Sequence, residues 1–238
     1  MTRSGDERPD AARAKVIGIV GAESTGKTLL VKELARTLRE RGLQVVTVPE
    51  ALRLFCEQEG RTPRADEQLA IAHAQTRAIS AACERGGIVL ADTTALMTAV
   101  YSEVIFGDVS LREQALQDHA RCDLTLLTAL DLPWVSDGIF RDGPQVRDQV
   151  DDCLRRLLQE GGVSHALVMG KGLRRQANAL SSIEHLLSAP ARRQRGASAG
   201  ARWRWFCDNC DDGECEQHWL TRSIRPGADE GVGGGDGA

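Results

Sequence analysis

The segment VIGIVGAESTGKTLLVKELA, from Val16 to Ala35, sets the architecture of this chain. It joins an apolar run to a helical pattern through a loop of the form G-x-x-x-x-G-K-[ST]. In such loops the glycines let backbone N–H groups face a phosphate, the lysine reaches the β- and γ-phosphates, and the hydroxyl binds Mg²⁺. The segment predicts an ATP site, with Lys27 catalytic and Thr28 on Mg²⁺, formed by Gly21, Ala22, Glu23, Ser24, Thr25, Gly26, Lys27, Thr28 and Leu29.

Apolar runs and helical patterns alternate along the rest of the chain. Strands are predicted at 14–20, 43–48, 86–92, 123–130 and 165–169, and helices at 27–40, 51–59, 65–84, 94–105, 111–121 and 173–187. Strands this apolar, separated by helices, are typical of a parallel sheet covered on both faces. We therefore expect an α/β P-loop fold with a doubly wound, mostly parallel five-stranded sheet and helices on both faces.

The composition divides the chain into five segments. We expect a flexible tail over 1–14, the P-loop domain over 15–188, a basic linker over 189–202, a small Cys/His-rich extension over 203–222 and a disordered Gly-rich tail over 223–238.

The bulk composition is that of an ordinary globular protein. Of 238 residues, 42% are apolar and 27% are charged, and the formal charge of −4 gives no reason to expect a nucleic-acid partner. No apolar run reaches the roughly 20 residues that cross a bilayer. The N-terminus lacks the apolar region of a secretory signal, so we expect a cytoplasmic protein without a membrane partner. A homo-oligomer is compatible with the sequence.

Three acidic residues follow predicted strands, where ligands of open α/β sheets bind. Asp92 follows four apolar residues, as a Mg²⁺-binding carboxylate does in P-loop enzymes, although it could instead cap the next helix. Glu50 could orient or deprotonate an acceptor hydroxyl, or simply favour the start of a helix. Arg53 could bind a phosphate, pair with Glu50 or lie in solvent. The third acid is Asp131.

Four motifs in order are similar to those of the NadR-type ribosylnicotinamide kinases. They are GAESTGKT (21–28), VPEALR (48–53), ADTTALMTAVYSEVIFG (91–107) and DLPWVSDGIFRDG (131–143), and the resemblance spans roughly residues 15–180. It implies ATP-dependent phosphorylation of the 5′-hydroxyl of nicotinamide riboside to nicotinamide mononucleotide, in NAD salvage. The family's adenylyltransferase and DNA-binding parts have no counterpart here, so those roles are not expected.

The same resemblance implies roles for residues after the fourth strand. Trp134 and Asp137 look like the acceptor-binding pair, with the indole stacked on the pyridinium ring. Arg141 and Arg147 would close over the triphosphate, although both could be surface residues and Arg147 could pair with Asp151. Where the family usually has D-T-D, this chain has Asp92-Thr93-Thr94, so the contact of the second acid is lost or moved.

The seven cysteines form two groups. Cys207, Cys210, Cys215 and His218 follow the spacing C-x2-C-x4-C-x2-H, which suits structural Zn²⁺, although a disordered tail with fortuitous cysteines is the alternative. The preceding RWRWF combines basic and aromatic residues, as single-strand binders do, but a latch onto the domain is the preferred interpretation. The other cysteines are expected to be reduced thiols: Cys56, Cys83, Cys122 and Cys153.

Two functions remain open from the sequence. The preferred one is a small-molecule kinase, because no N-K-x-D guanine motif occurs and the body is too small for a motor. The other is a nucleotide-dependent regulatory module whose C-terminal segment contacts a partner or nucleic acid. The acceptor itself is not fixed by these motifs.

Overall fold

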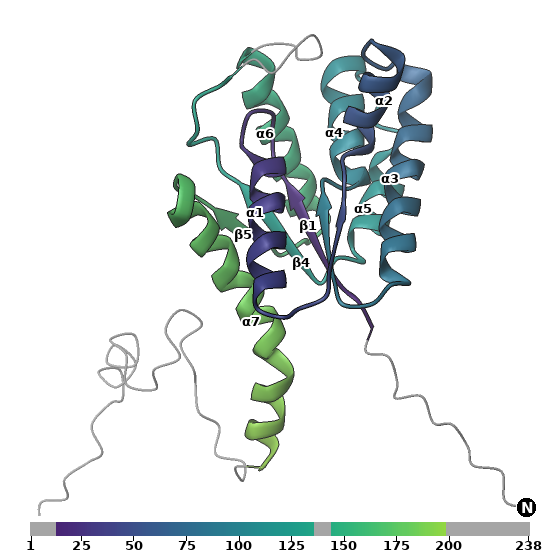
Figure 1. The fold of residues 1–238 in the computed structure, drawn as a ribbon. Coiled ribbons are helices and arrows are strands. Elements are labelled where there is room, and N and C mark those ends of the chain that lie inside the picture. The colour runs from purple at the N-terminus through teal and green to yellow at the C-terminus, as the bar shows by residue number, and fades with distance from the viewer. Residues whose placement is uncertain (1–12, 136–143, 199–238) are drawn as a thin grey trace, which may run out of the picture. The chain divides into compact units, whose positions relative to one another are not determined.

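The computed structural model describes residues 13–135 and 144–198 (Figure 1). Five strands form one sheet in the order β2-β3-β1-β4-β5, and each neighbouring pair is parallel. The strands are β1 (Lys15–Val20), β2 (Val45–Val48), β3 (Ile88–Asp92), β4 (Leu124–Thr128) and β5 (Ala166–Val168). The predicted parallel five-stranded α/β fold is confirmed.

Seven α-helices and one 3-10 turn connect the strands in the described ranges. They are α1 (Lys27–Glu40), α2 (Ala51–Glu59), η1 (Ala65–Glu67), α3 (Gln68–Cys83), α4 (Ala95–Phe106), α5 (Arg112–His119), α6 (Pro144–Glu160) and α7 (Gly172–Ser198). No helix within 13–135 and 144–198 is long and apolar enough to span a membrane.

Alternating side chains of the strands fill two cores on opposite faces of the sheet. On β1, Ile17 and Ile19 pack against α1 and α7, whereas Val16 and Val20 face the opposite side. Helices α3, α4 and α6 cover that second face, and α5 packs on α3 and α4 (Figure 1). Because both faces are covered, the strands are apolar on both sides, as the sequence pattern indicated.

No bounds were predicted for α6, and two other helices differ clearly from their predicted ranges. The helix expected over 65–84 begins with the 3-10 turn η1 before α3, and the Glu67 carboxylate accepts a hydrogen bond from the Arg64 backbone N–H at 2.8 Å at this start. Helix α7 continues to Ser198, past the expected end at Leu187, although the added stretch contains Pro190 and Gly196, both poor helix formers.

The four cysteines outside the C-terminal cluster are free thiols, as predicted: Cys56, Cys83, Cys122 and Cys153. Burial raises the pKa of each thiol, to about 12 for Cys122.

Candidate active site

The loop after β1, in the centre of the sheet, is shaped by close backbone packing. Gly21 has φ 148°, and a Cβ there would lie 2.0 Å from the Thr128 hydroxyl oxygen. Only glycine fits, because the backbone needs positive φ and the space is filled. The Thr128 hydroxyl donates to Thr25 Oγ1 at 2.7 Å, and Thr25 Oγ1 donates to the Ala22 carbonyl at 2.7 Å. The loop is therefore held rigidly from β4.

The amino end of α1 presents an anion site. Its N-cap, Gly26, has φ 77° and gives no side-chain hydrogen bond to the first turn. The backbone N–H groups of that turn and the positive end of the helix dipole favour a bound phosphate. Lys27 adds a cation at this end, with its Nζ 2.9 Å from the Ala22 carbonyl oxygen. These features are compatible with the ATP site that the sequence motif predicts, and the roles of the individual residues stay predictions.

A hydroxyl and a carboxylate meet beside this end of the helix. Thr28 Oγ1 donates to Asp92 Oδ2 at 2.6 Å, although the two residues are 64 positions apart. Asp92 is 4% exposed, and its Oδ1 is buried without a hydrogen-bond partner in the described part of the chain. Mg²⁺ prefers such oxygen ligands. Thr28 and Asp92 thus fit a magnesium ion, whereas Asp92 makes no cap for α4, whose N-cap is Thr94.

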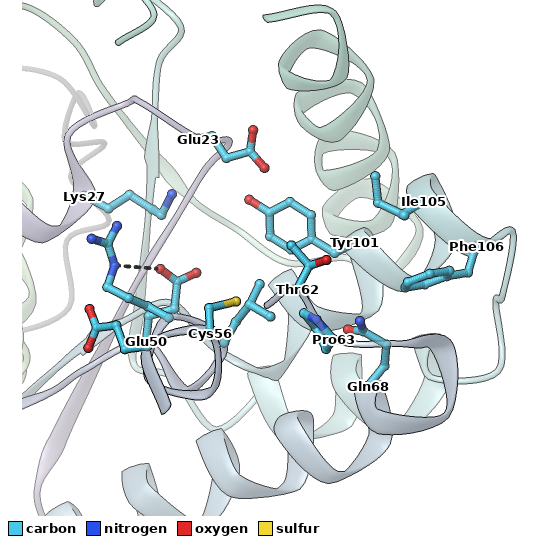
Figure 2. Close-up of a pocket in the computed structure, with 13 residues that line it drawn as sticks. Glu23, Lys27, Glu50, Cys56, Thr62, Pro63, Gln68, Tyr101, Ile105 and Phe106 are labelled. Atoms are coloured by element: carbon cyan, nitrogen blue, oxygen red, sulfur yellow. Dashed lines mark ion pairs between the residues drawn. The ribbon is translucent and has the colours of Figure 1, made fainter. Parts of the chain in front are cut away.

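Two cavities meet at the phosphate loop. One of about 430 Å³ lies over the loop and the first residues of α1. The other, of about 340 Å³, lies among α2, α3 and α4 (Figure 2). Lys27, Glu50 and Arg53 line both cavities. A nucleotide in the first cavity and an acceptor in the second would thus meet at the same three charged side chains.

Glu50 is the N-cap of α2 and points into the second cavity (Figure 2). It makes no side-chain hydrogen bond to α2, whose Ala51 N–H instead donates to Gln75 Oε1 at 2.7 Å. Arg53 Nε lies 3.8 Å from Glu50 Oε2, so of the three alternatives for Arg53 the pairing with Glu50 is seen. That an acceptor enters beside this pair stays a prediction.

The segment after β4 packs onto the phosphate loop. Ser24 Oγ donates to the Val135 carbonyl at 2.7 Å, and the Trp134 indole Nε1 is buried without a partner among the described residues. Arg147, at the start of α6, is 6% exposed, and its Nη2 donates to the Leu132 carbonyl at 2.9 Å. Arg147 thus holds the backbone of this segment.

Among the described residues, Asp151 pairs with Arg155 and not with Arg147, which was the alternative. Asp151 Oδ2 instead accepts a hydrogen bond from Arg155 Nε at 2.6 Å. Six other predicted site residues lie outside the described residues, so their roles stay predictions: Asp137, Arg141, Cys207, Cys210, Cys215 and His218.

Arg175 is a part of the site that sequence reasoning missed. It lies on α7 and is 5% exposed. Its Nη2 donates to the Thr25 carbonyl at 2.7 Å, and its Nη1 donates to Asp131 Oδ1 at 2.7 Å. Desolvation opposes ionisation of Asp131, but hydrogen bonds from the Gly170 N–H and Arg175 lower the pKa of that carboxyl. The only sequence signal was a basic pair just after the fifth strand.

Thr94, where the family usually has an acid, faces the protein core. Its hydroxyl lies 2.8 Å from Nδ1 of His119, whose Nε2 lies 2.9 Å from the Thr125 hydroxyl. Burial lowers the pKa of His119 to about 4, so the ring is neutral. In the described residues Thr94 lines neither of the two cavities. The side chain at this position therefore stabilises the contact of α4 with α5 and β4.

Comparisons with known proteins agree with this geometry. A family model described as an AAA domain matches residues 16–175. A crystal structure of a NadR protein in complex with NR is 25% identical with a TM-score of 0.62, over 73% of this chain and 51% of that chain. The chain thus spans about half the length of that structure. A search of curated proteins gave no match.

A thymidylate kinase from Ehrlichia chaffeensis has the same fold. It is 18% identical with a TM-score of 0.53, over 73% of this chain and 99% of that chain.

Proposed function

Since the chain belongs to the AAA domain family and has the fold of a NadR-like P-loop NTPase kinase domain, we propose that it is an ATP-dependent small-molecule kinase. We further propose that it phosphorylates the 5′-hydroxyl of nicotinamide riboside, giving nicotinamide mononucleotide for NAD salvage. One observation carries the proposal: Lys27, Glu50 and Arg53 line both the cavity over the phosphate loop and the cavity among α2, α3 and α4.

The donor half of the reaction rests on the phosphate loop. The first-turn N–H groups of α1 and Lys27 would bind the β- and γ-phosphates of ATP. Thr28 and Asp92 would hold Mg²⁺, which neutralises charge on those phosphates. Arg175 and Thr128 keep the loop in shape without touching the nucleotide. Catalysis of this kind depends on positioning and charge neutralisation, which a rigid loop supplies.

The acceptor half rests on Glu50 and Trp134. The hydroxyl oxygen of the acceptor would form a bond to the γ-phosphorus while the bond from phosphorus to the β–γ bridging oxygen breaks and ADP leaves. Glu50 would take the hydroxyl proton and pass it to solvent. Trp134 lines neither cavity in the described residues, so its stacking on the cationic pyridinium ring is proposed from the family resemblance alone. Arg147 would keep the segment that carries Trp134 in place. Asp137 and Arg141 are proposed to complete the acceptor site and the lid.

A regulatory module with nucleotide-dependent switching is the alternative function. Such a switch needs no second cavity beside the phosphate loop, and the 340 Å³ cavity that contains Glu50 therefore favours the kinase. From sequence alone we also propose a structural zinc site in the C-terminal cysteine cluster and a cytoplasmic location.

Product formation from Mg-ATP and nicotinamide riboside tests the proposal, with other nucleosides as parallel acceptors. Wild type is compared with Lys27→Ala and Trp134→Ala. Nicotinamide mononucleotide from wild type, with strong loss in both variants, is the expected result. ATP hydrolysis without transfer to any nucleoside would refute the kinase and favour the switch. Transfer to another nucleoside alone would leave the kinase standing and replace the acceptor.

A further inference from the structure

The acceptor cavity contains a buried amide without a protein partner. Gln68 is the first residue of α3 and is 2% exposed. Its side chain lines the 340 Å³ cavity, and its Oε1 has no hydrogen-bond partner in the part of the chain that the structure describes. Buried polar atoms in native proteins are nearly always hydrogen-bonded, so an unpartnered oxygen on a side chain that lines a cavity points to a ligand.

A second glutamine on the same helix shows the ordinary case. Gln75 lies two turns further along α3 and is 1% exposed. Its Oε1 accepts from the Ala51 N–H at 2.7 Å, and its Nε2 donates to the Thr93 carbonyl at 3.3 Å. Gln75 therefore joins α3 to α2 and β3. Gln68 is about as buried and lines the cavity, but its oxygen has no such bond among the described residues.

The cavity has a charged side and an amide side. Figure 2 shows Lys27 and Glu50 on one side and Gln68 with Pro63 and Phe106 on the other. In the proposed reaction the reacting hydroxyl lies at the charged side, because the phosphate is transferred there. The part of the acceptor furthest from that hydroxyl, which in a nucleoside is the base, then lies near Gln68.

We propose that Gln68 selects the base of the acceptor by pairing its amide with a planar group that offers one hydrogen-bond donor beside one acceptor. A carboxamide or a lactam edge has this pattern, and a carboxylate does not. The inference rests on the proposed function and narrows its substrate class to ribosides whose base carries an amide-type edge.

The preference for a carboxamide over a carboxylate follows from whether Gln68 Oε1 gains a hydrogen-bond donor. A carboxamide donates to Gln68 Oε1, so the buried oxygen gains its missing partner. A carboxylate has no donor, so the same oxygen stays unpaired and faces a negative charge. Leaving one buried polar group unpaired corresponds to roughly a 10- to 100-fold loss of kcat/KM.

The test compares nicotinamide riboside with nicotinic acid riboside, which differ only in carboxamide against carboxylate. We expect wild type to prefer the amide by roughly 10- to 100-fold in kcat/KM. Gln68→Leu should bring this ratio close to one. Gln68→Glu should keep the preference, because its carboxylate accepts from the carboxamide and repels the acid.

Gln75→Leu is the matched control. It should lower Tm, because the Ala51 N–H and the Thr93 carbonyl lose their bonds, but leave the substrate ratio unchanged. Gln68→Leu should have a Tm at or above that of wild type, since it removes an unpaired buried oxygen. If Gln68→Leu keeps the wild-type ratio while both ribosides are phosphorylated, the inference is overturned and the kinase stands. If wild type phosphorylates neither riboside, the proposed acceptor fails and the inference fails with it.

Discussion

Lowering the pH from 7 to 5 should destabilise this protein through one buried imidazole. His119 lies between the hydroxyls of Thr94 and Thr125, and burial lowers its pKa to about 4, from an ordinary value of 6.5. Between these two values the unfolded chain binds a proton that the folded protein does not. Stability is therefore fully present above about pH 6.5 and is lost as the pH falls toward 4.

The size of the effect follows from the two pKa values of His119. A shift of about 2.5 units corresponds to about 3 kcal/mol when the loss is complete, at about 1.4 kcal/mol per unit. At pH 5 the loss amounts to about 2 kcal/mol relative to pH 7. Such a loss is a large share of the 5–15 kcal/mol that holds a typical domain together.

Urea unfolding at pH 7 and at pH 5 measures this loss. His119→Gln keeps a donor and an acceptor between the two threonines but binds no proton, so its free energy of unfolding should change by about 2 kcal/mol less than that of wild type over this range. His73→Gln, at an exposed position, is the control and should behave as wild type. An equal pH dependence in wild type and His119→Gln would refute the argument that the buried ring stays neutral.

Three further substitutions test the phosphate site. Asp92→Asn should lower the rate of phosphoryl transfer roughly 100-fold or more and raise the Mg²⁺ concentration needed, because a charged metal ligand is lost. An unchanged Mg²⁺ titration would contradict the metal role of Asp92. Arg175→Met should lower the free energy of unfolding by about 3 kcal/mol and weaken ATP binding, measured by denaturation and calorimetry, while Arg174→Met at the exposed neighbour changes neither. Gly21→Ala should abolish ATP binding because its Cβ has no room, whereas Gly42→Ala, in open space, should cost about 1 kcal/mol and leave binding intact.

The sequence predicted those parts of the fold that are determined by residues close together in the chain. The bounds of α1 and α2 are those expected, because a glycine ends each helix or lies next to its end and apolar residues recur with helical spacing. The NadR-like P-loop domain could be predicted because its loop motif is a short run of neighbouring residues. The comparisons confirm this domain. The bounds of most other elements shifted by one to a few residues, whereas helix α7 ends at Ser198 rather than at the expected Leu187.

Apart from the meeting of Thr28 and Asp92, which the motifs indicated, the sequence could not predict contacts between distant segments. Arg175 reaches Thr25 across 150 residues, and Thr128 reaches it across 103. Neither contact leaves a local pattern, because an arginine in a helix and a threonine in a strand are ordinary residues there. Thr94 shows the same limit: the sequence analysis expected the contact of the second acid to be lost or moved, but it could not predict that Thr94 bonds to His119 in the core.

The hydrogen bond from Arg175 to the phosphate loop also bears on when a growing chain can bind the nucleotide during protein synthesis. The ribosome makes the loop early, but the arginine that bonds to its Thr25 carbonyl comes 150 residues later. At 5–20 residues per second, the loop exists for about 8 to 30 s before that partner is made. A nascent chain that already displays the whole ATP motif should therefore bind the nucleotide more weakly than the finished chain, and we expect full affinity only once α7 has been added.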